Sequence, residues 1–258
     1  MSDAPWPYPF WIAHRGAGKL APENTLAAFR VGASHGYRAF ECDVKLSADG
    51  VPFLLHDDTL ERTTTAQGVA GERDWSALSR LDAGGWHSRA FAGEPIPSFE
   101  AIAGYVLSNG FALNVEIKPT IGREAETGRR VASEAARLWA ADRTASAPPP
   151  LLSSFQPAAL AAAREGASGL PRALLLASLR DGWFEQARGL GCVAVVTAYP
   201  LMDAPLIARL HEAGLRALVY TVNDAAEVER LVSIGIDGII TDAVDRFSPG
   251  TLTPTLSR

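Results

Sequence analysis

Residues 39–58 read AFECDVKLSADGVPFLLHDD. One apolar run carries Glu41, Asp43 and Lys45, and a second, VPFLL, is followed by His56. Because successive side chains on a strand alternate between its faces, the three charged side chains share one face. Two carboxylates on one face suit a hard divalent cation such as Ca²⁺ or Mg²⁺, and a nearby histidine can move protons at neutral pH. Taken alone, the pattern also fits the solvated face of an antiparallel sheet.

The length, composition and net charge limit the domain organisation and the partners that we expect. The chain has 258 residues, of which 47% are hydrophobic, and a net charge of -5. This is enough to bury the core of one large α/β domain or of two small ones. No basic run is present that could neutralise many phosphates, so we expect no nucleic-acid partner.

The N-terminal segment, MSDAPWPYPFWIAHRG, has an acidic residue where a signal peptide carries positive charge, and three prolines interrupt its apolar part. No run approaches the roughly 20 apolar residues of a membrane span. We therefore expect a cytoplasmic protein without stable membrane association. The only cysteines, Cys42 and Cys192, are far apart in predicted strands, which favours buried thiols over a disulfide. The oligomeric state is not predicted.

Apolar runs of strand length alternate with longer helical patterns along the whole chain, which is typical of parallel βαβ units. The eight candidate strands span residues 9–15, 39–46, 112–119, 150–155, 171–178, 192–199, 215–223 and 236–242. Eight strands with this rhythm favour a TIM (β/α)8 barrel, with an open doubly wound sheet as the second choice.

One interval breaks this rhythm. Residues 57–97 are too many for a βα loop and too rich in Gly, Thr and Asp for one helix. We interpret them as an insertion over the barrel mouth, within a barrel domain of residues 1–246. After Asp242 little can pack, so we expect a short or absent last helix and a disordered tail at 247–258.

A barrel predicts that functional side chains lie at the C-terminal ends of its strands. The candidate strands carry such side chains: His14 and Arg15 on the first, Glu41 and Asp43 on the second, Asn114, Glu116 and Lys118 on the third, and Tyr220 and Asn223 on the seventh. Taken alone, His14 fits a core histidine and Arg15 a surface ion pair. Ionisable residues inside a barrel are costly to bury unless paired or ligated, and their recurrence on three strands favours a functional cluster.

The sequence resembles the glycerophosphodiester phosphodiesterases in motifs that occur in the family's order from Trp11 to Asp242. The residues that carry the resemblance are His14-Arg15-Gly16, residues 21–25 (APENT), Glu41-Cys42-Asp43-Val44, Asp49-Gly50, residues 56–64 (HDDTLERTT), Ile96-Pro97, Glu116-Ile117-Lys118, Thr221-Val222-Asn223 and residues 238–242 (GIITD).

The resemblance implies a TIM barrel with a small insertion after the second strand, in agreement with the break at 57–97. It implies that one divalent cation, Mg²⁺ or Ca²⁺, binds to Glu41, Asp43 and Glu116. The other implied roles are an acid/base pair, His14 and His56; two cations that hold phosphate, Arg15 and Lys118; and two residues that shape the site, Glu23 and Asn24.

Aromatic side chains are expected to form the apolar side of the site. Phe155 ends the fourth candidate strand, where a core position is equally consistent with the sequence. Tyr220 begins the motif YTVN, and Asn223, which ends it, is expected to support the site. Many members of the family have Trp in place of Tyr220. Tyrosine keeps an aromatic wall but adds a hydroxyl, so the preferred headgroup stays open.

The chemistry of these side chains suits phosphodiester hydrolysis. The negative charge of a phosphodiester grows as a nucleophile adds, and a metal with Arg15 and Lys118 can stabilise it. Two histidines can take a proton from the attacking hydroxyl and give one to the leaving alcohol. By resemblance, we expect metal-dependent hydrolysis of glycerophosphodiesters, such as glycerophosphocholine or glycerophosphoethanolamine, to glycerol 3-phosphate and an alcohol through a cyclic phosphate. The sequence does not decide which histidine acts first as the base.

Three alternatives stay open. A lysophospholipase D-type phosphodiesterase would act on lipid diesters and would have an apolar loop or helix at the mouth. A metal-dependent barrel lyase or isomerase would share the carboxylates but would not need the histidine pair. A non-catalytic binding protein on a barrel scaffold is the third, because a fold alone does not give a function. The complete set of ligand and acid/base residues argues against it.

Overall fold

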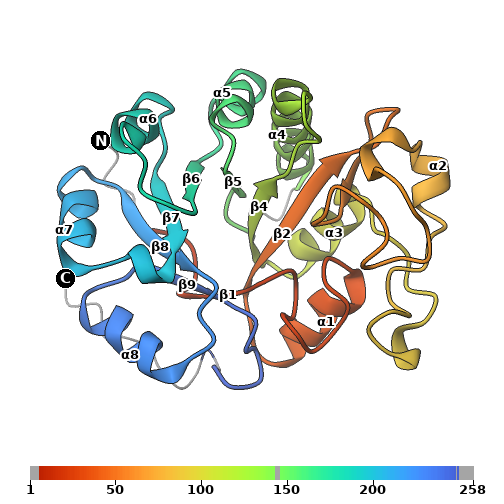
Figure 1. Ribbon diagram of the computed structural model, residues 1–258, viewed down its shortest axis with the longest axis horizontal. Coiled ribbons are helices and arrows are strands. Elements are labelled where there is room, and N and C mark those ends of the chain that lie inside the picture. Colours follow the sequence, from red (N-terminus) through yellow and green to blue (C-terminus); the bar gives the residue numbers. More distant parts are fainter. Residues whose placement is uncertain (1–5, 143–145, 248, 250–258) are drawn as a thin grey trace.

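Parallel strands close into a barrel in the computed structural model, which describes residues 6–142, 146–247 and 249 (Figure 1). The strands are β1 (Trp11–Ala13), β2 (Ala39–Leu46), β3 (Pro52–Leu54), β4 (Ala112–Ile117), β5 (Leu151–Ser154), β6 (Arg172–Leu176), β7 (Ala194–Ala198), β8 (Arg216–Tyr220) and β9 (Gly238–Thr241). Because β1 pairs in parallel with both β2 and β9, the sheet closes on itself. The predicted TIM barrel is confirmed. The second choice, an open doubly wound sheet, is wrong. An open sheet has two unpaired edge strands, whereas β1 here pairs with both β2 and β9.

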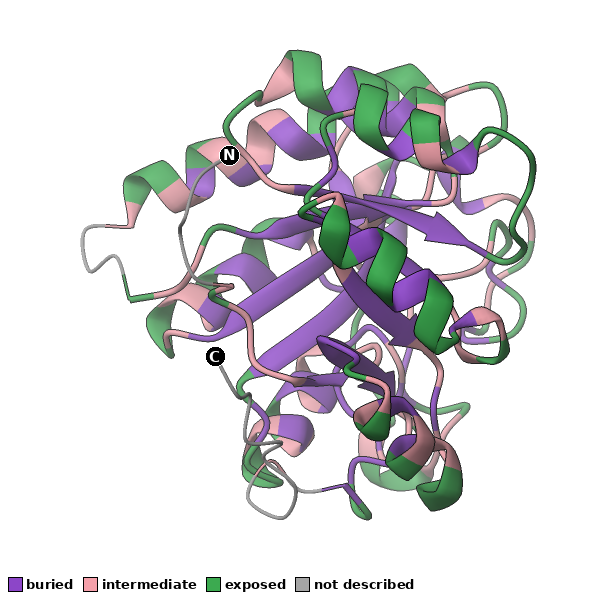
Figure 2. Cartoon of the chain, turned by 90° about the vertical axis from the view of Figure 1, so that its left-hand side faces the viewer, coloured by how far each residue is buried: buried purple, intermediate pink, exposed green. Residues whose placement is uncertain are grey.

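Helices surround the barrel (Figure 1). They are α1 (Leu26–Ser34), α2 (Trp75–Leu78), α3 (Phe99–Ser108), α4 (Glu124–Ala141), α5 (Pro157–Gly166), α6 (Trp183–Gly189), α7 (Ala204–Glu212) and α8 (Ala225–Ser233), with 3₁₀ turns η1 (Ala70–Glu72), η2 (Arg89–Phe91) and η3 (Tyr199–Leu201). Their outward sides are exposed while the strands between them are buried (Figure 2), as expected of amphipathic helices. Among the described residues, no helix has both the length and the apolar character that crossing a membrane requires.

The two faces of β2 serve different layers. Phe40, Cys42 and Val44 belong to the large core between the barrel and its helices, so the alternating residues Glu41 and Asp43 face the barrel interior. Both cysteines of the chain are free and buried, as the sequence predicted.

An apolar layer fills the interior beneath the polar strand ends. Its members come from β1, β2 and β4 to β9: Ile12, Ala39, Ala112, Leu151, Ala173, Leu175, Ala194, Val196, Leu218 and Ile240. Because side chains repeat every two residues along a strand, the next interior position after Ile12 is His14, and the next after Ile240 is Asp242. The apolar layer therefore lies directly beneath the polar side chains.

A short strand, β3, lies between β2 and the predicted insertion at 57–97, and the sequence did not predict it as a separate strand. β3 pairs antiparallel with β2, and α2 lies beside it at the edge of the molecule (Figure 1). The β3 region and the insertion share a small core of their own, formed by Phe53, Leu55, Leu60, Ala70, Leu78, Ala83 and Ile96. His56 lies two residues beyond β3 and directly before the insertion, so this region determines where the histidine lies.

The end of the chain has turns but no helix after β9 in the residues that the structure describes, in agreement with the expectation of a short or absent last helix. The tail predicted to be disordered, 247–258, lies almost entirely outside the described residues.

Candidate active site

Polar side chains at the strand ends surround one cavity of about 220 Å³. It is lined by His14, Arg15, Glu41, His56, Asn114, Glu116, Lys118, Phe155, Leu175, Tyr220, Thr221 and Ile240. The other predicted site residues lie behind this lining: Asp43 contacts Arg15 and Lys118, Asn24 contacts Asp43, Glu23 contacts Arg15, and Asn223 contacts Asp242. The structure thus brings every predicted site residue to the same end of the barrel.

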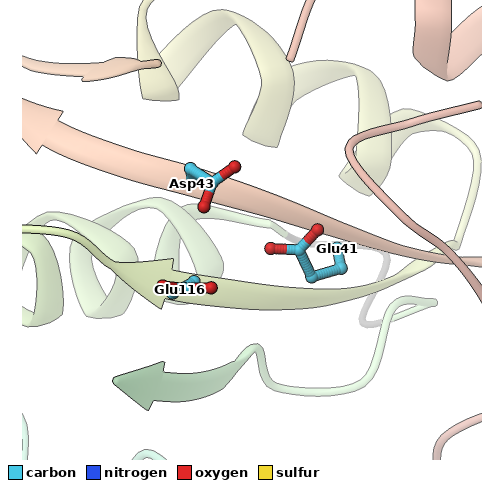
Figure 3. A group of neighbouring side chains, drawn as sticks. All are labelled: Glu41, Asp43 and Glu116. Carbon is cyan, nitrogen blue, oxygen red and sulfur yellow. The ribbon is translucent and has the colours of Figure 1, made fainter. Parts of the chain in front are cut away.

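Three carboxylates meet on the wall formed by β2 and β4 (Figure 3). Asp43 and Glu116 are register partners on these strands, and one oxygen from each of Glu41, Asp43 and Glu116 lies within 4.8 Å of the others. The Oε1 atom of Glu41 is buried without a hydrogen-bond partner among the described residues. Three oxygen donors this close, one of them unpartnered, fit a hard divalent cation.

The charges of the cluster are unbalanced without such a cation. Burial, with Asp43 and Glu116 nearby, raises the pKa of Glu41 well above its usual range. Burial and Asp43 raise the pKa of Glu116 to about 7. Burial acts in the same direction on Asp43, but Arg15, His56 and Lys118 outweigh it and lower the pKa of this carboxyl. The cluster therefore resists holding three negative charges by itself, as expected of carboxylates packed together out of water.

The loop after β1 holds the carboxylates in place through two residues with strained backbone. Arg15 has φ of 51° and Asn24 of 59°, a region that costs non-glycine residues about 1–3 kcal/mol. The backbone N–H of Arg15 donates to Oε2 of Glu41 at 3.0 Å. Asn24 donates from Nδ2 to Oδ2 of Asp43 at 2.8 Å, and its Oδ1 accepts from the backbone N–H of Asp43 at 3.0 Å. Both conformations orient a carboxylate of the cluster.

His14 is held by a carboxylate from the last strand of the barrel. Its Nδ1 lies 2.6 Å from Oδ1 of Asp242, whose Oδ2 accepts from Nδ2 of Asn223 at 3.1 Å. Since a carboxylate only accepts, Nδ1 of His14 donates, and Nε2 is left for the cavity, 3.8 Å from Oε2 of Glu41. Asp242 is not among the predicted site residues, although the rule that functional side chains lie at strand ends includes it, because it directly follows β9.

His56 has an equivalent partner, its neighbour Asp57, with Nδ1 2.6 Å from Oδ1. Burial lowers the pKa of His56, and the cations Arg15 and Lys118 lower it further, against the opposing effect of Asp43. Asp57 and Asp58 are adjacent in the sequence, and no pattern in it predicts which of them contacts His56.

Two basic side chains, Arg15 and Lys118, contact the carboxylates. Nζ of Lys118 is 3.4 Å from Oε1 of Glu116, and Nε of Arg15 is 3.3 Å from Oδ2 of Asp43. Both side chains line the cavity, so an anionic group there would meet positive charge on one side.

An aromatic pair forms the apolar wall. The rings of Phe155 and Tyr220 are in edge contact, with centroids 5.7 Å apart. Tyr220 donates its hydroxyl to the carbonyl of Leu176 at 3.1 Å, and burial raises its pKa to about 12. The hydroxyl therefore stays protonated and directed at the backbone, which leaves the ring for a bound molecule.

We expect Gly18→Ala to disturb the contact between Asp242 and His14. A Cβ atom at Gly18, where φ is 56°, would lie 2.2 Å from the carbonyl oxygen of Asp242 and 2.3 Å from its Cα. At Gly36, where φ is 88°, an added Cβ meets nothing within 4 Å, so Gly36→Ala costs only the backbone term of about 1–2 kcal/mol. Urea unfolding should show a larger loss for Gly18→Ala than for Gly36→Ala. Equal losses would contradict this close packing.

The fold and this arrangement of side chains define an enzyme built on a TIM barrel. The sequence profile of the glycerophosphoryl diester phosphodiesterase family matches residues 14–246, and the chain belongs to this family. The prediction of a phosphoric diester hydrolase is thereby confirmed.

Individual relatives agree with this assignment. A glycerophosphodiester phosphodiesterase of Caldanaerobacter subterraneus subsp. tengcongensis is 30% identical over 232 residues, which cover 90% of this chain and 93% of the relative. The structure of an Oleispira antarctica phosphodiesterase in complex with the product sn-glycerol-3-phosphate has 30% identity and a TM-score of 0.86, covering 93% of this chain and 95% of that chain. A Mus musculus glycerophosphoinositol inositolphosphodiesterase is 48% identical over only 94 residues, which are 33% of this chain and 17% of that protein.

Proposed function

We propose that this protein hydrolyses glycerophosphodiesters such as glycerophosphocholine and glycerophosphoethanolamine to glycerol 3-phosphate and an alcohol, in the cytoplasm and with one divalent cation, Mg²⁺ or Ca²⁺. The observation that carries the proposal is the cluster of Glu41, Asp43 and Glu116, whose donor oxygens lie within 4.8 Å of one another beside two histidines that each contact a carboxylate. The complex of the Oleispira antarctica relative with sn-glycerol-3-phosphate supports this choice of product.

The site separates its tasks by charge. Glu41, Asp43 and Glu116 would hold the divalent cation, which would supply Lewis-acid stabilisation of the charge that grows on the phosphoryl oxygens. Arg15 and Lys118 line the cavity and hold the phosphate through charge-assisted hydrogen bonds. Phe155 and Tyr220 bound the other side, where they exclude water from the substrate's apolar part.

The histidines move the protons. The lowered pKa of His56 keeps its ring neutral at neutral pH, which suits the base that takes the proton from the neighbouring glycerol hydroxyl. That hydroxyl oxygen bonds to phosphorus, the bond from phosphorus to the headgroup oxygen breaks, and His14 gives the leaving oxygen a proton. Water then opens the cyclic phosphate with the two roles exchanged. In this scheme Asp242 and Asp57 hold each ring with Nε2 toward the reacting atoms.

A lysophospholipase D-type activity is the second candidate. The side chain of Ile121, in the loop between β4 and α4, is 86% exposed, and an apolar side chain near the strand ends would suit the acyl chain of a lipid diester. A lyase or isomerase is less well supported, because enolate chemistry gives no role to a second histidine with its own carboxylate.

The test is release of glycerol 3-phosphate from glycerophosphocholine by purified protein, first with chelator and then with Mg²⁺ or Ca²⁺ added back. We expect activity to vanish with chelator and to return with at least one cation. Parallel assays with glycerophosphoethanolamine, glycerophosphoinositol and a lysophospholipid separate the headgroup and lipid alternatives. Cation binding without turnover of any glycerophosphodiester would contradict the proposal, and full activity in chelator would contradict the metal dependence.

A further inference from the structure

We propose that Arg62 is a positioning residue that joins the insertion to the barrel and sets the directions of His56 and Arg15 across the mouth. The inference rests on the proposed function, in which these two side chains act on the substrate. Arg62 itself does not line the cavity, and its side chain is 44% exposed.

On the side of the insertion, Arg62 binds both oxygens of Asp57. Its Nε donates to Oδ2 at 2.6 Å, and its Nη2 donates to Oδ1 at 3.0 Å. The same Oδ1 accepts from Nδ1 of His56 at 2.6 Å. A carboxylate held at two points fixes the direction of its third partner, because planar guanidinium groups grip carboxylates with defined geometry. Nε2 of His56 is thereby left for the cavity.

On the side of the barrel, Arg62 binds both oxygens of Glu23. Its Nη1 donates to Oε2 and its Nη2 to Oε1, both at 2.7 Å. Oε1 of Glu23 also accepts from Nη1 of Arg15 at 2.9 Å. The result is a row of alternating charges that runs from Arg15 through Glu23 and Arg62 to Asp57. His56 contacts the last member of this row.

Isolated exposed ion pairs stabilise proteins by only about 0–1 kcal/mol, whereas bidentate pairs and networks contribute more, and this row has both of these features. The side chain of Glu23 is 13% exposed and that of Asp57 is 28% exposed, and Arg62 engages both oxygens of each. The hydrogen bond from Arg62 is the main cause that lowers the pKa of Asp57. Asp57 therefore stays ionised and able to accept from His56.

The backbone around His56 has other contacts. The N–H of Leu55 donates to the carbonyl of Asp43 at 3.1 Å, and buried Lys45 contacts Oδ1 of Asp58 at 2.6 Å. The segment therefore stays in place without Arg62, and what Arg62 adds is the direction and charge environment of the imidazole. His14 needs no such bridge, because its partner Asp242 belongs to the barrel.

Removing Arg62 should therefore raise the pKa of His56. The charged groups that face this ring are Asp57 from its own segment, Asp43 from β2, Arg15 from the loop after β1 and Lys118 from the end of β4. With Arg62 gone, the negative charge of Asp57 is no longer offset, so the protonated ring is favoured. Disorder of the segment would expose His56 and would also raise its pKa, because burial is the main cause that lowers it, so the rise supports the inference only where the melting temperature is unchanged.

The test compares Arg62→Met and Arg62→Lys with Arg80→Met. Arg80 is an exposed arginine of the same insertion that donates from Nε to the carbonyl of Ser76, and its substitution should leave activity unchanged. We expect Arg62→Met to lower kcat on glycerophosphocholine by roughly 10- to 100-fold, the usual cost of losing a partner that orients a functional side chain. Lysine should restore little, because one ammonium group cannot bind two carboxylates through both oxygens of each.

The second readout is the His56 imidazole pKa, followed by NMR titration of the metal-free protein without substrate. We expect it to rise in Arg62→Met and to stay at the wild-type value in Arg80→Met. An unchanged His56 pKa with only a lower melting temperature would overturn the inference, and so would unchanged kcat in folded Arg62→Met. If wild-type protein turns over no glycerophosphodiester, the proposed function fails, while the NMR titration still decides whether Arg62 acts on His56.

Discussion

Replacing His56 with Ala is expected to lower kcat on glycerophosphocholine by about 10²- to 10⁴-fold, the usual contribution of a general acid or base. Fold and cation binding should be largely kept. His56 lines the cavity from a segment outside the barrel wall, and the carboxylates proposed to bind the cation lie on β2 and β4. The measurements are steady-state kinetics for turnover, circular dichroism for the fold and calorimetric titration for Mg²⁺ or Ca²⁺ binding.

His35→Ala is the matched control, since His35 is exposed at the end of α1 and does not line the cavity. It should retain wild-type kcat. Near-native turnover by His56→Ala would show that the proton transfers use another group, and the proposed mechanism would then be wrong even if the substrate is right. Loss of cation binding together with activity would assign His56 to the cation site instead.

The side chains that face the barrel interior could be predicted from the sequence because they depend on a period of two. Glu41 and Asp43 follow from alternation along β2, and Asn114 and Glu116 follow from the same alternation along β4. Closure of the barrel then brings the two pairs together, since Glu41 and Asn114, like Asp43 and Glu116, are register partners. Only strand assignment was needed for this part of the site.

The partners of the two histidines required more than periodicity. Asp242 is 228 residues from His14 along the chain, and their contact depends on barrel closure and on the turn after β1. Asp57 and Arg62 lie in an insertion whose path the βα rhythm does not determine. Side chains on irregular segments are placed by turn geometry and by each other, so sequence alone did not show that Arg62 contacts both Asp57 and Glu23.

The second large effect is expected from Glu116→Gln, which removes one of the three carboxylates proposed to bind the cation but keeps the size of the side chain. Cation affinity and activity should fall by more than the roughly 10- to 100-fold that follows loss of an outer partner of a metal site. The same substitution should make the metal-free protein less sensitive to pH. At neutral pH the substitution should stabilise the metal-free protein and destabilise the cation-bound protein. The reason is that the carboxylate favours the cation-bound state and disfavours the empty one.

The direction in which stability changes with pH follows from the pKa of Glu116. Burial raises its pKa in the folded, metal-free protein to about 7, against 4.5 for the ordinary carboxyl. Between these two values the folded state holds more protons than the unfolded state, so the free energy of unfolding decreases as pH rises through this window. Each pKa unit is worth about 1.4 kcal/mol. Glutamine does not titrate, so this decrease should become smaller in the variant.

The test is urea unfolding of wild type and Glu116→Gln, in chelator and in excess cation. It is measured at about pH 5 and about pH 7.5, the two ends of this window. In chelator, wild type should lose stability towards the higher pH more steeply than the variant. Excess cation should remove this loss in wild type, because a bound cation keeps the carboxylates ionised, and should do little for the variant. If the free energies of unfolding of wild type and Glu116→Gln depend on pH to the same extent in chelator, Glu116 is ionised without a cation. The cluster would then need no cation to balance its charge.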